Sequence, residues 1–513
     1  MPVGLEEEDA ELEAKVEQVY RKLDRRILPA LWTLYFLCAA IRSNVSLSLT
    51  MNTSSGHSLK QTLHLTGKQV STGVALFYVC YVVFDAPANL LMTRLSPQVW
   101  MARIVIGVAI IGACHAALSA AWNFYLLRLL LGIVIAGMWP GMAYYLTLFY
   151  PPELTGKRIG QYYTAAQVSA AVVGLVSAGF QLMDGMGGLT GAQWMFLLYG
   201  LVTFVVGVAL LWWLPDRPSP PAAAAAEGTA TPARWWHKLK PHSAPALRGG
   251  DARVHYADLT RVYHVPPWGL RDLWRVIQDW RLWPLTLMYF GVVGIGIGVQ
   301  IFATLIISSI LPHVSSIQLS LLYAPIWICD LIAILIFTPL SDRFNNYRPL
   351  FFILPVCVQI AGLLVTTFAG GGGWQRYAGL LIVGFGLGPT VPTVMAWTSE
   401  TFQPRHGEVG VAAATALVSG LGNLGSVTTT YALYTGWERD AQPGPHQYRL
   451  SNLAMVGILG MSMISAVGMW VAVSIVDGGK KKGGEIRRAM DGAARRAQRG
   501  QRGFDGMFGR RRK

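Results

Sequence analysis

The chain has 513 residues, of which 53% are hydrophobic and only 13% charged, and its mean hydropathy is +0.40. A soluble globular protein carries about a quarter charged residues, so this composition excludes a soluble enzyme and a disordered scaffold. The net charge is +15, and 13 of the 42 Lys and Arg residues lie in a basic tail after Gly479, which indicates contact with anionic inner-leaflet lipid rather than with nucleic acid.

The hydrophobic residues fall into blocks of about 20 or more, the length that a helix needs to cross a bilayer core roughly 30 Å thick. The predicted fold class is therefore an all-α membrane protein with twelve transmembrane helices. The expected spans are 27–50, 69–93, 100–120, 122–149, 158–182, 193–214, 282–309, 317–340, 348–368, 376–398, 409–434 and 452–477. Residues 1–26 form an N-terminal tail without the apolar core of a signal peptide.

The first span contains a charged residue, Arg42, about 15 residues from its start and so roughly 22 Å into the membrane. A lone charge costs several kcal/mol in a bilayer and usually marks a cavity, a relay or a partner. Because a guanidinium matches a carboxylate with two hydrogen bonds, we predict that Arg42 binds an organic anion. The alternative is that it neutralises an acid or caps carbonyls of a neighbouring helix. Asn44 is a further candidate for the binding site.

Charged residues recur in the second and fourth spans. Asp85 lies toward the end of span 69–93, where a structural hydrogen bond competes with a role in proton coupling. Arg128 lies about six residues into span 122–149, at a depth similar to that of Arg42, so the two could form a positive patch. Its alternative is to reach the membrane surface with its long side chain. Tyr144 is expected to shape the cavity.

A hydrophilic loop, 215–281, separates the sixth span from the seventh. Its first part, SPPAAAAAEGTATPA, has low complexity. Its last part, WGLRDLWRVIQDWRLW, places Trp268, Trp274 and Trp280 at near-helical spacing. This pattern predicts a helix at the membrane surface, with an ordinary soluble helix as the alternative.

The second half of the chain carries three further polar candidates. Gln300 and Asn423 lie within hydrophobic, glycine-rich stretches and could face a cavity. Asp330 lies deep in span 317–340, in IWICDLIAIL, with no obvious partner. A carboxyl so buried could cycle protons, the alternative being a neutral acid hydrogen-bonded to a neighbouring helix.

Six spans, a long loop and six more spans predict two six-helix halves, 27–214 and 282–477. The turns MTRLSPQVW and PLSDRFNNYRP occupy equivalent places in the two halves, and Arg94, Asp342 and Arg343 in them are candidate gating residues. Lys and Arg are concentrated in both tails and in the loops on the same side. The positive-inside rule therefore places both tails, including 478–513, and the loop 215–281 in the cytosol.

The sequence contains no nucleophile–base constellation, metal cluster or phosphate loop, and its five cysteines all lie within predicted spans. We therefore expect no enzymatic activity, no disulfide framework and no cofactor.

Several stretches resemble a known family. RLLLGIVIAGMWPGMAYYLTLFY (128–150), FDAPANLLMTRLSPQVW (84–100), KRIGQYYTAAQVSAAVVG (157–174) and MDGMGGLTG (183–191) are similar to the fungal anion:cation symporters of the major facilitator superfamily, the allantoate permease-like proteins. The second half resembles them more weakly, for example through LSDRFNNYRP (340–349). The resemblance implies the major facilitator fold, a midplane site between the halves and transport of a carboxylate or vitamin-like acid.

The resemblance also implies roles for single residues. Arg42 and Asn44 match the family's Arg-x-Asn, and Arg128 matches the Arg that opens the fourth-span motif. Ile41 and Ile135 stand where the family usually has Asp and Glu, so proton coupling would be weakened, absent or carried by Asp330 or Asp85.

We predict a plasma-membrane transporter that moves a small organic anion by alternating access, with possible proton coupling. A facilitated diffuser or exchanger of the same class and a nutrient sensor without transport remain alternatives.

Overall fold

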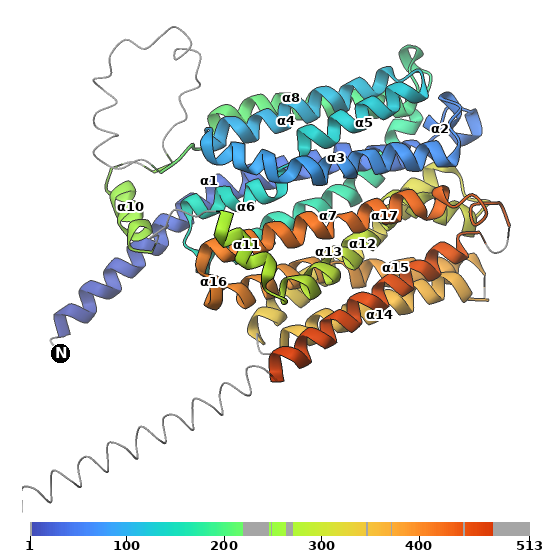
Figure 1. Ribbon diagram of the computed structural model, residues 1–513. Helices are drawn as coiled ribbons and strands as arrows, with labels where there is room; N and C mark the ends of the chain where they lie inside the picture. Colours follow the sequence, from blue (N-terminus) through green and yellow to red (C-terminus); the bar gives the residue numbers. More distant parts are fainter. Residues whose placement is uncertain are drawn as a thin grey trace, which may run out of the picture.

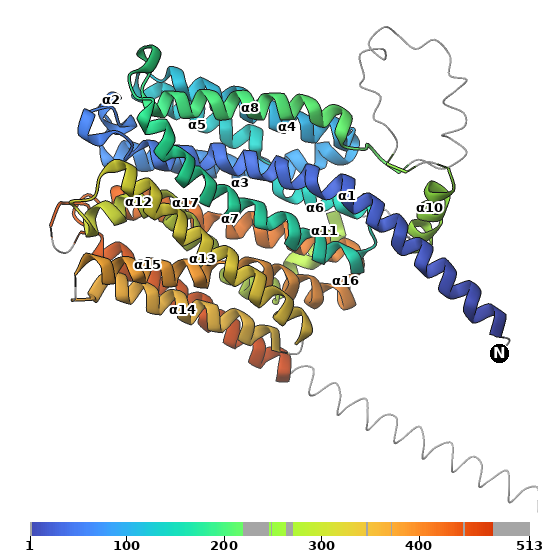
Figure 2. The same cartoon turned by 180° about the vertical axis from the view of Figure 1, so that it is seen from behind.

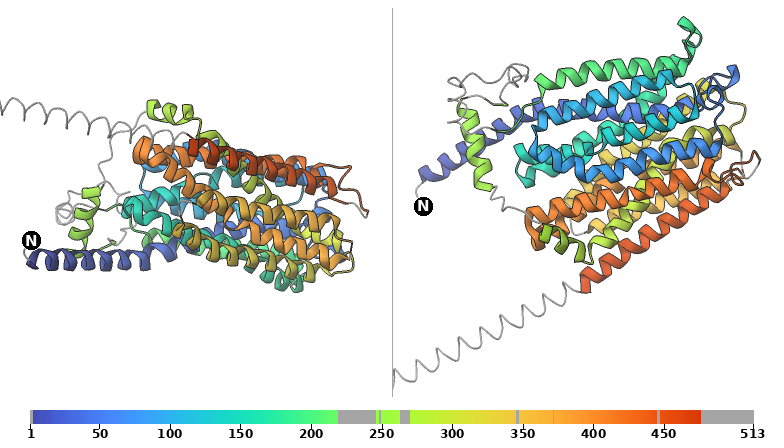
Figure 3. Two further views of the ribbon diagram at one scale, coloured as in Figure 1. Left: turned by 90° about the horizontal axis from the view of Figure 1, so that it is seen from below. Right: turned by 45° about the horizontal axis from the view of Figure 1, so that its top comes forward.

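The computed structural model describes residues 3–218, 246–247, 249–262, 270–344, 347–370, 372–444 and 447–475. These residues are helical throughout apart from turns and short connections, as the sequence predicted. The long helices run roughly parallel to one axis in two groups that lie side by side (Figures 1 and 2). Further views keep this arrangement and show the start of the first helix projecting from one end (Figure 3).

The two groups follow the order of the chain. The first consists of α1 (Val3–Ser48), the short α2 (Leu59–Thr62), α3 (Gly67–Arg94), α4 (Pro97–Cys114), α5 (Ala121–Ile135), α6 (Met138–Phe149), α7 (Pro152–Leu182) and α8 (Gly191–Trp213). Two helices of the central loop follow, α10 (Gly250–Val262) and α11 (Leu270–Gln278). The second group consists of α12 (Leu282–Ile310), α13 (Ser316–Arg343), α14 (Arg348–Phe368), α15 (Gly373–Leu387), α16 (Thr390–Gly422), α17 (Leu424–Ala432) and a last helix, Arg449–Ile475.

Eleven helical segments in the described part of the chain are long and apolar enough to cross a membrane. They coincide with eleven of the twelve predicted spans. The remaining prediction, 409–434, falls on the second part of α16 and on α17, which together are helical except at Asn423. The N-terminal tail differs from expectation, because α1 begins at Val3 and enters its span without interruption.

Three of the long helices begin with the same capping arrangement. Thr66, Thr190 and Ser315 each accept a hydrogen bond from the backbone of a Gln three residues later, whose side chain in turn accepts from the backbone of the cap. This reciprocal pair satisfies two N–H groups that have no partner within the helix, and it fixes where α3, α8 and α13 begin.

The predicted span 122–149 is interrupted, which the sequence analysis missed. Gly137 adopts the left-handed region (φ 78°) between α5 and α6 and serves as the N-cap of α6. The Asp85 carboxylate accepts a hydrogen bond from the Gly137 backbone N–H at 2.9 Å. A side chain at residue 137 would meet the Cβ of Ala88 at 2.6 Å. The break therefore depends on a glycine and on the acid that faces it.

The two ends of the bundle differ in how they are closed. We refer to the end that carries the short helix α2 as the α2 end, and to the opposite one as the α10 end. At the α2 end the halves are joined by Ser71 Oγ and Thr435 Oγ1, 2.6 Å apart, and by Gln181 Nε2, which donates to Ser320 Oγ at 2.8 Å. Nearer the middle, Ser46 Oγ donates to the Ile301 carbonyl at 2.6 Å.

The substitution Thr435→Val should weaken this closure. It keeps the shape of the side chain but leaves the buried Ser71 hydroxyl without its partner, which costs about 1–3 kcal/mol. We expect a cysteine introduced at Val293, which lines the central cavity, to react several-fold faster with an impermeant thiol reagent applied from the α2 side. Thr428→Val on the exposed face of α17 is the matched control. Equal labelling rates in the two variants would contradict the expected role of the hydroxyl pair.

At the α10 end, the central-loop helix α10 rests on the first half of the protein (Figure 1). Tyr20 donates to Asp258 and Lys22 to Asp251, both at 2.6 Å. His255 is buried, with its Nε2 at 2.8 Å from the Phe149 carbonyl oxygen at the end of α6. The imidazole also meets the Tyr20 ring edge-on, with 5.6 Å between ring centroids. These contacts fix α10 to α1 and α6.

The attachment of α10 should weaken in acid. Burial lowers the pKa of His255 below its ordinary value of about 6.5, while the bond to Phe149 and the charge of Asp258 offset part of this effect. As the pH falls below about 6.5, His255 becomes protonated in the released helix but stays neutral while α10 is attached. The attachment therefore loses stability until the pH reaches the lowered pKa of the attached state. Hydrogen–deuterium exchange of 250–262 should therefore rise between pH 7 and pH 5, after correction for intrinsic rates. His255→Gln, which keeps a donor but does not titrate, should remove that dependence, and an unchanged dependence would exclude His255 as its origin.

The central-loop helix α11 lies nearer the second half and contacts α16. In α11 Val276 is buried and Trp274 is exposed, and Trp280, which is also exposed, follows the end of the helix. Trp268 lies outside the described residues. Placement at a membrane surface remains a prediction.

Helix α1 is held to α7 along its length. Arg158 forms a two-pronged ion pair with Asp24, at 2.6 and 2.7 Å, and Ser169 Oγ donates to the Phe36 carbonyl at 2.7 Å. Pro29 lies between these attachments and removes one helical hydrogen bond. Because α1 is tied to α7 on both sides of Pro29, we expect it to move together with the first half.

Candidate functional site

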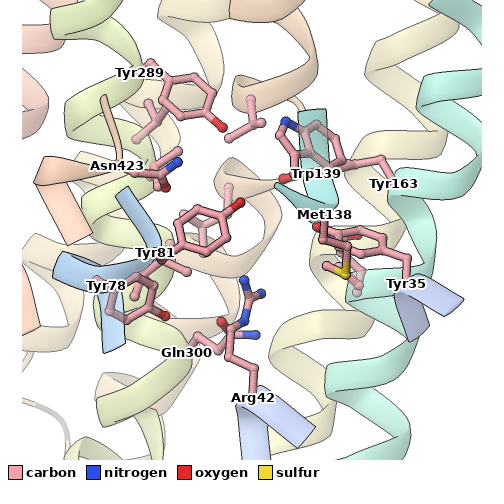
Figure 4. A pocket seen from close by; sticks show the side chains of 18 of the residues that line it. Tyr35, Arg42, Tyr78, Tyr81, Met138, Trp139, Tyr163, Tyr289, Gln300 and Asn423 are labelled. Carbon is pink, nitrogen blue, oxygen red and sulfur yellow. The ribbon is translucent and has the colours of Figure 1, made fainter. Parts of the chain in front are cut away.

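A central cavity of about 130 Å³ lies between the two halves. Its walls come from α1, α3, α5, α6 and α7 of the first half and from α12, α13, α15 and α16 of the second. Aromatic side chains form a large part of the wall, with Tyr35, Phe77, Tyr78, Tyr81, Trp139, Tyr163, Tyr289 and Trp327 contributing to it. Figure 4 shows several of these rings facing one another across the cavity.

Arg42 extends from α1 into this cavity beside Gln300 (Figure 4). Its guanidinium Nε is buried and has no hydrogen-bond partner among the described residues. Among the lining residues described, Arg42 is the one cation. Ile135, where the resembled family usually has an acid, also lines the cavity, so the wall lacks that neutralising group. A buried charge without a partner is costly, and the arrangement is therefore suited to receive an anion.

Two more of the six predicted binding residues line the cavity. Gln300 on α12 donates its amide to Ser43 Oγ at 3.1 Å, across the boundary between the halves. Asn423 lies at the break between α16 and α17 and donates its amide to the Ser419 carbonyl at 2.8 Å. Each amide keeps an oxygen and one N–H for further bonds, so both can hydrogen-bond a polar ligand.

The other three predicted binding residues lie away from the described lining. Asn44 is fully buried in α1, and both amide atoms lack a hydrogen-bond partner in the described part of the chain. Tyr144 is partly buried and packs against the hydrophobic core. Arg128 is 1% exposed, so it does not extend to the membrane surface. Its guanidinium lies 5.1 Å from the centre of the Phe77 ring, and that ring lines the cavity.

The two candidate acids occupy different environments. Asp85 is bound to the Gly137 backbone and is absent from the described lining, which favours the structural interpretation. Asp330 lines the cavity, is 2% exposed and interacts with the side-chain amide of Gln167 on α7. Its Oδ1 has no hydrogen-bond partner among the described residues. Asp330 therefore remains a candidate for an exchangeable proton or for contact with a ligand.

The candidate gating residues lie at helix ends. Arg94 ends α3, and Arg343 ends α13 with an exposed side chain. The side chains of Arg94 and Asp342 lie outside the described residues. Within the described part of the chain, no group of three His, Cys, Asp or Glu residues is placed to hold a metal ion.

Sequence reasoning missed the aromatic wall and Gln167. An aromatic residue in a hydrophobic span can face lipid, core or cavity, and the sequence alone does not decide among them. One signal was available: Tyr78, Tyr81, Tyr163 and Tyr289 lie well inside helices, whereas Tyr in a membrane protein is enriched at the membrane surfaces. Hydroxyl groups at that depth require polar surroundings, as Gln167 does.

Comparison with known proteins gives consistent results. The Major Facilitator Superfamily model matches residues 31–428. The chain is 45% identical over 456 residues to a protein named Vitamin H transporter 1 from Schizosaccharomyces pombe, covering 88% of this chain and 79% of that protein. It is 27% identical to a putative tartrate transporter of Agrobacterium vitis, covering 84% and 86% of the two chains. The structure of the xylose transporter XylE from E. coli aligns with a TM-score of 0.61 at 14% identity, covering 86% of this chain and 97% of that one.

Proposed function

The chain belongs to the Major Facilitator Superfamily, and we propose that it carries a small organic anion across a membrane by alternating access. Within the superfamily we place it with the anion:cation symporters of the allantoate permease type. The observation that carries the proposal is Arg42, a cation that lines the cavity between two halves and has no acidic partner among the described residues. Transport by alternating access requires no covalent chemistry.

The relatives narrow the substrate class. One is named for vitamin H, and another is a putative tartrate transporter, and both compounds are carboxylic acids. An arginine fork suits the carboxylate that they share. Gln300 and Asn423 add hydrogen bonds, and the aromatic wall adds apolar contact. We propose biotin, which is vitamin H, as the first substrate to test.

The orientation follows from charge. Lys and Arg in the tails and in the central loop support a cytosolic position for the α10 end, which we propose together with the plasma membrane as the location. The hydroxyl pair of Ser71 and Thr435 and the bond from Gln181 join the halves at the α2 end. We therefore interpret this structure as the state that is closed to the outside.

Coupling to protons is a separate part of the proposal. Ile41 is buried in the core and Ile135 lines the cavity, so neither supplies the carboxyl that the resembled family has there. Asp330 is the described acid that lines the cavity and could take over that role. Without such a role, the protein would exchange its substrate or let it equilibrate.

The test is uptake of labelled biotin, nicotinate, pantothenate, allantoate and tartrate by cells that lack their own permeases. The assay is run at acidic pH, with and without a protonophore. Accumulation that the protonophore abolishes indicates symport, and equilibration that the protonophore leaves unchanged indicates a facilitated diffuser or exchanger. Binding by the purified protein without any flux would reject transport and favour a nutrient sensor.

A further inference from the structure

Resting on the proposed function, we propose that the cavity selects a monocarboxylate whose opposite end donates N–H hydrogen bonds. In this assignment Arg42 binds the carboxylate of the ligand, and Asp330 accepts hydrogen bonds from the N–H groups at its other end. Asp330 therefore determines which acids bind. A cyclic urea or amide that carries an acid on an alkyl chain has this chemistry. Short dicarboxylates should be excluded.

The first argument is that the cavity has two ionisable residues, Arg42 and Asp330, that form no ion pair with each other. Arg42 and Asp330 line the same cavity. The ion pairs of the described residues join other side chains, and the electrostatic partners of Arg42 are tyrosines rather than Asp330. Two opposite charges in one cavity attract strongly only when they are close. A ligand can therefore contact both of them without breaking an ion pair first.

The second argument is the distance between them along the bundle. Arg42 lies six residues before the end of α1 at Ser48, which is about 9 Å from the α2 end of that helix. Asp330 lies 14 residues after the start of α13 at Ser316, which is about 21 Å from the same end. The two levels differ by about 12 Å. A ligand that reaches both must be long, with polar groups at its two ends.

The third argument concerns the wall between these levels. By the same measure Tyr35 and Tyr78 lie at intermediate depths, about 20 and about 17 Å from the α2 end, and Tyr81 reaches the level of Asp330. Figure 4 shows Tyr81 above Arg42. Aromatic faces pack well against an alkyl chain. A short diacid bound to Arg42 would place its second carboxylate among these rings, where no described lining residue is a cation. Taking that charge out of water without a partner is strongly unfavourable.

The fourth argument is the unmet bonding capacity of Asp330. Its carboxyl is 2% exposed, and Oδ1 has no hydrogen-bond partner among the described residues, while the Gln167 amide is its polar neighbour. Buried polar atoms in proteins nearly always have a partner, so an atom without one at a cavity wall indicates a place for a ligand donor. An N–H group fits this place, whereas a carboxylate has acceptor oxygens only and offers no donor to Oδ1.

The experiment is competition with labelled biotin on the purified full-length protein, measured both by equilibrium binding and by counterflow in proteoliposomes at equal pH on both sides. Biotin carries a cyclic urea on a pentanoate chain. Lipoic acid carries the same acid chain on a ring without N–H groups, and biotin amide keeps the urea but lacks the carboxylate. Tartrate tests the exclusion of dicarboxylates. The variants are Asp330→Leu, which removes the acceptor, and Asp330→Asn, which keeps an acceptor oxygen but cannot carry a proton.

We expect wild-type protein to bind biotin at least tenfold more tightly than lipoic acid, and tartrate in hundredfold excess to leave biotin in place. Asp330→Leu should reduce that preference about tenfold through weaker biotin binding, with lipoic acid unchanged. Asp330→Asn should keep part of the preference, even where uphill accumulation is lost.

Three results would overturn the assignment. They are equal affinity of the wild type for biotin and lipoic acid, strong competition by tartrate, and an Asp330→Leu variant that weakens both monocarboxylates equally. The first two require only wild-type protein, so they decide the matter even when Asp330→Leu fails to fold. Failure of every acid to bind or exchange would reject the proposed function itself, which is a different outcome from acids that bind without the expected selectivity.

Discussion

Replacing Arg42 by glutamine should reduce uptake of the substrate at least a hundredfold, measured as kcat/KM at low substrate concentration. The side chain extends into the cavity and is the one cation among the described lining residues, so its loss leaves the substrate carboxylate desolvated and without a counter-charge. Loss of a charge-assisted, two-pronged contact costs about 3 kcal/mol, which corresponds to a factor of roughly 100. Arg42→Lys keeps the charge but lacks the planar guanidinium, so its kcat/KM should fall between those of the wild type and Arg42→Gln, about tenfold below the wild type.

Two further substitutions decide whether this loss is specific. Arg103→Gln removes an exposed arginine on α4 that stacks on Trp100, and it should leave uptake unchanged. Arg128→Gln removes a charge that contacts the Phe77 ring and is not itself in the described lining. It should reduce uptake less than Arg42→Gln does. Normal uptake by an Arg42→Gln protein that reaches the membrane would refute the anion-binding role of this residue.

Replacing Gly137 by valine should prevent correct folding. The backbone at this position has φ 78°, which costs a residue with a side chain about 1–2 kcal/mol, and more when that side chain is β-branched. The new Cβ would also meet the Cβ of Ala88 at 2.6 Å, and such overpacking adds about 1–3 kcal/mol. The connection from α5 to α6 would have to move, and the bond to Asp85 would be lost with it.

The measurement is the monodisperse fraction and the thermal midpoint of the protein purified in detergent. Gly457→Val on the exposed face of the last helix is the control, since a Cβ there meets nothing within 4 Å. We expect little monodisperse protein for Gly137→Val and near-normal behaviour for Gly457→Val. A thermal midpoint of Gly137→Val equal to that of the wild type would show that the backbone at this position is not fixed.

Much of the architecture could be predicted because membrane helices are long, continuous stretches of apolar residues that can be recognised in the sequence. Blocks of apolar residues located eleven spans that the structure also contains, and the long polar stretch located the boundary between the halves. The interruption at Gly137 was harder to predict, because the surrounding residues are apolar on both sides and glycine is common in membrane helices. The contact between Asp85 and this glycine can be seen only in the structure, because the two residues are far apart in the sequence.

The site could be predicted in part, for a related reason. Arg42 and Asp330 attract attention in any membrane span because charge is rare there, and both line the cavity. Asn44 is two residues from Arg42, which turns it about 200° around the helix, and it is buried away from the described lining. Tyr144 was predicted to shape the cavity, whereas the described lining contains Tyr78 and Tyr81. Sequence alone identifies the unusual residue but not the side of the helix on which it lies.

The attachment of α1 to α7 on both sides of Pro29 has a kinetic consequence. Arg42 travels with the first half, whereas Gln300 and Asn423 travel with the second. A bound molecule that touches both sets forms a bridge between two bodies that otherwise separate and re-form their contacts in each cycle. When the halves reorient with substrate bound, the bonds between the substrate and both halves are kept. When the empty protein makes the same movement, it has no such bonds to stabilise it. Exchange of one substrate molecule for another should therefore be faster than net export, and the ratio of the two rates would measure how much the bridge stabilises the intermediate in which both gates are shut.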